Sequence, residues 1–220
     1  MRLLLISLFF LTTTATAQEL PDFKVPANYS KIWEVKGDLD KDGIAEVVYA
    51  YNTNKPDGAS GFFRILYICK LFNGKAKLWK QNSSVLRSSK DCGFCLNKGI
   101  DLSINIKNNT LIIQQNFQHN ARHYSSNKNI FRYQNGDWFL IGSTYNVYDT
   151  CEFDDTYDIN FSTKQVSVAC TYGDCDEGKT AASDEFFDFK YPFKAIPKMD
   201  GFKPGKVELR IPKSRRFFYY

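Results

Sequence analysis

Histidine and methionine are scarce in this chain of 220 residues, which has two of each. Charge of one sign is not in large excess either, because 29 lysines and arginines face 24 acidic residues and leave a net charge of +5. A balance of this size gives no reason by itself to expect nucleic acid as a partner. The sequence has no P-loop, dinucleotide fingerprint, GxSxG elbow or HExxH motif. The familiar signatures of nucleotide-dependent enzymes and hydrolases are therefore missing.

Long apolar runs are absent beyond the N-terminus. Residues 3–11 are apolar except for Ser7, they follow Arg2, and small residues occupy positions 14–17. This order predicts a signal peptide over residues 1–17 that is cut after Ala17, and the run is too short for a membrane span. Its removal leaves 203 residues (220 − 17) with a charge of about +4. We expect an exported protein, periplasmic or extracellular, with no transmembrane segment.

Aromatic residues are abundant at 16%, and 43% of the chain is hydrophobic. Short β-branched and aromatic runs separated by turn residues predict strands, and no stretch has a sustained helical period. We expect a single β-rich domain over residues 18–220, an antiparallel sandwich or open barrel. The predicted strands cover residues 44–51, 62–72, 76–80, 85–86, 102–106, 110–117, 129–133, 138–141, 157–161, 165–170 and 207–211.

Two parts of the chain read as irregular. Residues 18–30 precede the first predicted strand, and residues 172–204 are rich in glycine, aspartate, lysine and aromatics. We expect the second part to be a long connection, with a short helix near residues 184–189.

Six cysteines in an exported chain favour disulfides, with 15 possible pairings. We expect Cys92 to pair with Cys95, and either Cys170 with Cys175 or Cys151 with Cys170. Cys69 is in none of these expected pairings.

The CxxC at Cys92–Cys95 has two other interpretations. A thiol oxidoreductase would need the pair to open a helix, whereas the flanking residues read as loop. A zinc site with Cys92, Cys95, Cys170 and Cys175 would have an unusual second spacing of CxxxxC. We favour a structural staple.

The strongest chemical motif is the segment GDLDKDGIAEVV at residues 37–48. Aspartates at three alternate positions surround one point when the chain curls, and Gly43 permits the bend. The main-chain carbonyl of Ile44 and the carboxylate of Glu46 would complete an oxygen cage, which suits one calcium ion better than magnesium. The segment is not an EF-hand, because position 12 is Tyr49. The expected ligands are Asp38, Asp40, Asp42, Ile44 and Glu46.

This motif resembles the calcium loop of FG-GAP and VCBS-type repeats, which is acidic at positions 1, 3, 5 and 9 and precedes a strand. The resemblance implies the same five ligands. It covers about 15 residues in a single copy, whereas a propeller needs several blades. Residues 131–142, FRYQNGDWFLIG, also resemble a hairpin in a group of uncharacterised exported bacterial proteins with one such loop. That second resemblance implies export and a β architecture.

Other constellations are weaker. His119 and His123 stand four residues apart but lie between predicted strands, so we expect them in a surface loop. Together with Arg122, they could bind an anion. The C-terminal residues 203–220 mix six cations with aromatics, a pattern that can bind single-stranded nucleic acid or a phosphate-rich membrane surface. An exported protein rarely meets nucleic acid, and we expect an edge strand with a partly buried tail.

The sequence thus predicts a non-enzymatic binding protein, stabilised by calcium, whose partner is a protein or a cell-envelope component. One alternative is an inhibitor or immunity protein against an exported enzyme. The other is an enzyme, either a thiol oxidoreductase through Cys92 and Cys95 or a hydrolase through His119 or His123.

Overall fold

The computed structural model describes residues 19–58, 61–92, 101–175 and 180–220. The expected signal peptide lies outside the described residues, and so does Cys95 with its expected disulfide to Cys92. No helix among the described residues is long and apolar enough to cross a membrane.

The first half of the chain forms a four-stranded antiparallel sheet in the order β1-β2-β3-β4. Asn73 and Gly74 join the last two strands, and both have positive φ, as the two central residues of a tight hairpin turn require. The strands are β1 (Ser30–Gly37), β2 (Glu46–Asp57), β3 (Gly61–Phe72) and β4 (Lys75–Asn82).

A seven-stranded antiparallel sheet follows, in the order β11-β10-β9-β8-β7-β6-β5. The turns Asn108–Asn109 and Asn135–Gly136 have positive φ at both residues, so the expected hairpins form there. The strands are β5 (Leu102–Lys107), β6 (Thr110–Gln118), β7 (His123–Gln134), β8 (Asp137–Asp149), β9 (Phe153–Asn160), β10 (Gln165–Tyr172) and β11 (Glu185–Lys190).

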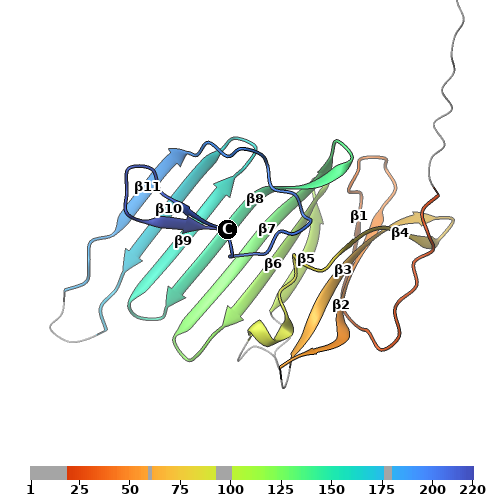
Figure 1. Cartoon of the computed structure of the whole chain (residues 1–220), viewed down its shortest axis with the longest axis horizontal. Helices are drawn as coiled ribbons and strands as arrows, with labels where there is room; N and C mark the ends of the chain where they lie inside the picture. The colour runs from red at the N-terminus through yellow and green to blue at the C-terminus, as the bar shows by residue number, and fades with distance from the viewer. Residues whose placement is uncertain (1–18, 59–60, 93–100, 176–179) are drawn as a thin grey trace, which may run out of the picture.

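One face of the seven-stranded sheet, here called the inner face, packs into the main core. The four-stranded sheet covers its β5 end, and the C-terminal segment crosses the strands at the other end (Figure 1). A short 3₁₀ helix η1 (Ser89–Cys92) precedes β5, and a small hairpin of β12 (Glu208–Arg210) and β13 (Phe217–Tyr219) closes the chain. The core joins residues from all three parts, among them Val48, Ile68, Ile104, Leu111, Phe131, Leu140, Val166, Met199, Phe202 and Phe218.

The predicted fold class is confirmed, because the protein is mainly β with antiparallel sheets and a long, largely irregular C-terminal segment. The expected helix at residues 184–189 is wrong. Residues 185–190 form β11, whose alternating exposure places Phe187 and Phe189 against the core. Strand β1 was not predicted, since lysines and glutamate interrupt its apolar residues, and Val85 and Leu86 are core residues outside any strand.

Candidate metal centre

The acidic motif is the loop that joins β1 to β2. Lys41 and Gly43 have φ of 71° and 81°, so the chain curls back on itself within a few residues. Asp38 Oδ1 accepts a 2.6 Å hydrogen bond from the Lys41 amide, and Asp42 Oδ1 accepts one of 2.8 Å from the Ile44 amide. The carboxylates therefore hold the turn, as aspartates do in Asx turns.

The three aspartates converge as the spacing predicts. One carboxylate oxygen from each of Asp38, Asp40 and Asp42 lies within 4.8 Å of those of the other two. The hydrogen bond from Ile44 is the largest influence on Asp42 and lowers its pKa, which favours the charged form. Three hard oxygen ligands therefore face one small region.

Lys70 of β3 reaches this acidic cluster from the neighbouring part of the sheet. Its ammonium forms an ion pair with Asp40 and lies 3.3 Å from Asp42 Oδ2 and 3.9 Å from Glu46 Oε1. Burial opposes its charge, but the hydrogen bonds to Asp40 and Asp42 outweigh that effect, so the pKa of Lys70 is raised. The ammonium also stands 4.7 Å from the ring centre of Trp79, within cation–π range. The chain thus supplies one internal cation to the loop.

Glu46, the first residue of β2, is the buried member of the set, with 1% of its surface exposed. Its Oε2 accepts a 2.7 Å hydrogen bond from the Leu39 amide. Burial raises its pKa despite that hydrogen bond, and the charges of Asp40 and Asp42 act in the same direction as burial. A buried carboxylate that faces other carboxylates is the kind of group that a bound cation would stabilise.

Two contacts fix the loop to the body of the protein. Leu39, between the first two aspartates, is 1% exposed and belongs to the main core. Asn109, in the turn between β5 and β6, donates a 2.9 Å hydrogen bond from Nδ2 to the main-chain carbonyl of Asp38. Gly37 allows the close approach of β1 to β5, because a Cβ there would lie 2.7 Å from Ile106. The acidic loop is therefore held against both sheets.

The donor set fits a hard divalent cation. All the side chains are carboxylates, and calcium takes six to eight oxygens in flexible geometry. With every carboxylate ionised, Asp38, Asp40, Asp42 and Glu46 carry −4 against +1 on Lys70. The negative excess gives a divalent cation a favourable place even with the lysine present.

The structure brings three of the five expected ligands into one group. Glu46 is not part of that group of oxygens, although its carboxylate shares Lys70 with Asp40 and Asp42. Ile44 exposes 54% of its surface, and the role of its carbonyl stays a prediction. Sequence reasoning missed Lys70 and Asn109. The sequence signal for Lys70 was a lone lysine inside the apolar run of β3. Asn109 has no such signal, because its sequence context indicates only a turn.

The expectation of a disulfide is confirmed within the described residues, but the expected pairings there are wrong. Cys151 is bonded to Cys175, and Cys69 and Cys170 are free and buried. The pairings of Cys170 with Cys175 or Cys151 are thus excluded, and the four-cysteine zinc site loses Cys175 as a ligand. Cys170 points into the core from β10, whereas Cys151 lies in the β8–β9 turn, where the chain around Gly173 returns to it.

His119 precedes β7 and His123 is its first residue, and the two side chains contact different partners. His119 Nε2 lies 2.8 Å from Ser125 Oγ, whereas His123 Nε2 lies 3.3 Å from Asp149 Oδ2. The serine and the aspartate therefore contact different histidines, which is not the relay of a catalytic triad. Arg122 forms ion pairs with Asp149 and Glu152, so its charge is already balanced and the expected anion site is not supported.

Comparison of the chain with protein-family models, with curated proteins and with solved structures finds no match.

Proposed function

We propose that this protein is an exported, non-enzymatic binding protein whose β1–β2 loop binds one calcium ion. The ligands in this proposal are Asp38, Asp40, Asp42, the carbonyl of Ile44 and Glu46, as in the FG-GAP and VCBS-type loops that the motif resembles. The convergence of three aspartate carboxylates within 4.8 Å is the observation that carries it.

The role of the ion is structural in this proposal. The loop contacts the main core through Leu39 and the β5–β6 turn through Asn109. Carboxylates that repel one another strain this junction, and a bound cation removes the repulsion. Calcium that binds only the folded state stabilises it by mass action, by about 2.7 kcal/mol at a hundred times Kd.

A thermal melt with calcium and with chelator tests the calcium site. For a chain of this size, about 2.7 kcal/mol corresponds to a rise in Tm of roughly 5–10 °C. Asp42→Asn should lose most of this rise. Asp188→Asn is the matched control, because Asp188 is an exposed carboxylate far along the chain that accepts hydrogen bonds from Gln165 and Ser167. Equal melting temperatures of the wild type in calcium and in chelator would contradict the proposal.

The location and the partner need separate experiments. Export is supported by the sequence of residues 1–17, and the bond between Cys151 and Cys175 suits an oxidising compartment. N-terminal sequencing of the mature protein should begin at Gln18. A pull-down of that protein from its own envelope fraction identifies the partner; recovery of an exported enzyme that the protein inhibits would favour the inhibitor class instead.

A further inference from the structure

The C-terminal tail buries Phe218 and Tyr220 and exposes three of its cations, whereas Phe217 exposes 42% of its surface. Phe218 and Tyr220 are buried in the main core, where Phe218 meets the rings of Phe189 and Tyr191. Arg210, Lys213 and Arg215 are exposed on the hairpin that precedes and includes β13. Because Phe218 and Tyr220 lie in the core, they are not available to stack on bases in the way that single-strand binding proteins use aromatic residues.

The three cations line one hollow. It has a volume of about 610 Å³ and lies between the hairpin and the segment at Tyr191–Pro192. Besides the cations, its wall consists of Tyr191, Pro192, Ile211, Pro212 and Ser214. Basic side chains therefore surround a largely apolar wall that contains no carboxylate.

These cations have no carboxylate partner among the described residues. The neighbouring Arg216 differs, because it pairs with Glu185 and contacts the Tyr172 hydroxyl. The nearby Glu208 accepts a 2.7 Å hydrogen bond from the Tyr219 hydroxyl instead of meeting a cation. The charge on Arg210, Lys213 and Arg215 is thus available to a ligand.

Hydrogen bonds stabilise the turn that carries the cations. The Ile211 amide donates to the Arg216 carbonyl at 2.9 Å, and the Ser214 amide donates to the Ile211 carbonyl at 3.1 Å. Arg210 Nε donates to the Ser214 carbonyl at 2.8 Å, which fixes one side of its guanidinium. A turn of this kind lowers the ordering cost of binding.

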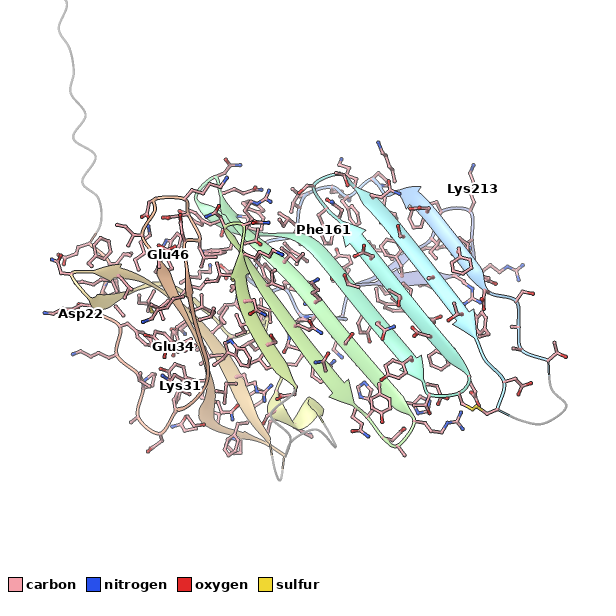
Figure 2. The ribbon with its side chains drawn as sticks, turned by 180° about the vertical axis from the view of Figure 1, so that it is seen from behind. Asp22, Lys31, Glu34, Glu46, Phe161 and Lys213 are labelled. Atoms are coloured by element: carbon pink, nitrogen blue, oxygen red, sulfur yellow. A yellow bond between two sulfur atoms is a disulfide. The ribbon has the colours of Figure 1, made fainter. Side chains whose placement is uncertain are left out.

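We propose that this hollow binds a phosphate group, free or as the headgroup of a lipid. Guanidinium groups pair with two oxygens of one phosphate at once, and an ammonium adds a point charge. The site is separate from the calcium loop, since Lys213 and Glu46 lie on opposite sides of the molecule in Figure 2.

Titration with inorganic phosphate tests the site, in calcium-free buffer at constant ionic strength with chloride as the reference anion. Amide and arginine Nε resonances of residues 210–216 and Tyr191 should shift in ¹H–¹⁵N spectra. Lys213→Gln with Arg215→Gln keeps the Arg210 hydrogen bond and should weaken binding at least tenfold, since one lost charge-assisted hydrogen bond already has about that effect. The charge-matched control is Lys107→Gln with Lys128→Gln, two exposed lysines on the seven-stranded sheet.

Vesicles distinguish the two sources of the phosphate. Binding to vesicles that contain phosphatidic acid, but not to vesicles of phosphatidylcholine alone, would identify a lipid headgroup as the ligand. The double variant Lys213→Gln with Arg215→Gln should then lose vesicle binding, and the control double variant should keep it. Binding of inorganic phosphate alone, with the same dependence, identifies the free anion. The proposal is overturned if neither probe binds, or if both double variants weaken binding equally, since diffuse positive charge would then explain it.

Discussion

The side-chain amide of Asn109 donates a 2.9 Å hydrogen bond to the main-chain carbonyl of Asp38, which lies 71 residues earlier in the chain. One residue belongs to the turn between β5 and β6, and the other begins the acidic loop after β1. The bond therefore joins the two sheets at the candidate metal centre.

Replacing Asn109 by glycine should destabilise the protein by about 1 kcal/mol, the usual net value of one hydrogen bond. Glycine accepts the φ of 55° at this position, so the change removes the amide without straining the turn. Asn108→Gly is the control, because Asn108 has a φ of 52° in the same turn. Urea unfolding measures both; equal losses in the two variants would assign the effect to the glycine itself.

Lys70→Met should make the protein more dependent on calcium. Methionine keeps an apolar chain near Trp79 but removes the cation that balances Asp40 and Asp42. We expect a loss of about 1–3 kcal/mol in chelator, because the partly buried carboxylates lose a charged partner, and a larger rise in Tm on adding calcium than in the wild type.

Lys77→Met is the matched control for this change. Lys77 has the same side-chain exposure of 19% and forms ion pairs with Glu19 and Asp22. The Lys77→Met substitution should leave the rise in Tm on adding calcium unchanged. A smaller calcium response in Lys70→Met than in the wild type would mean that the lysine supports the site and does not compete with the ion.

Arg122→Gln should change how stability depends on acid. The hydrogen bonds from Arg122 lower the pKa of Asp149 to about 2, from an ordinary value of 3.8. A carboxyl with a lowered folded pKa stabilises the fold above its unfolded pKa, and this contribution is lost as the pH falls through the folded pKa. The wild type should therefore be more stable than the variant by the largest margin at neutral pH, and this difference in stability should shrink between pH 3.8 and about 2.

Melting temperatures across that pH range measure this difference. Arg132→Gln on the same strand controls for the loss of one positive charge. A difference between the wild type and Arg122→Gln that stays constant down to pH 2 would show that the ion pair does not control the titration of Asp149.

Cys69 and Cys170 should resist alkylation in the folded protein. Burial raises the pKa of each thiol to about 12, so the reactive thiolate is scarce at pH 8. Peptide mapping after treatment with iodoacetamide should find both unmodified in the native state and modified in denaturant, with Cys151 and Cys175 linked. Rapid native labelling of either thiol would contradict this expectation.

The fold could be predicted largely because the strands follow one another. Turn residues such as Asn135 and Gly136 specify local hairpins, and alternation specifies which side of a strand is buried. Prediction was wrong where a long-range contact decides the outcome. The segment at residues 185–190 is a strand because it pairs with β10, and Cys175 meets Cys151 because the chain after β10 returns to the β8–β9 turn.

The candidate site shows the same division. Alternate aspartates and Gly43 predict the curled loop, because those interactions span only a few residues. Lys70 and Asn109 reach the loop through pairing of β3 and packing of the second sheet, which no short motif records. Which residues support the acidic loop thus depends on contacts that sequence spacing cannot supply.

The strand order of the seven-stranded sheet also determines when, during synthesis, its apolar face can be covered. Each strand of the seven-stranded sheet pairs only with strands next to it in the chain, and residues beyond β11 add one isolated bridge, between Phe139 and Lys198. Met199, Phe202 and Phe218 arrive last and cover the inner face. Until those residues are synthesised, the inner face lacks this apolar cover, and residues 191–220 then protect it from contact with other chains.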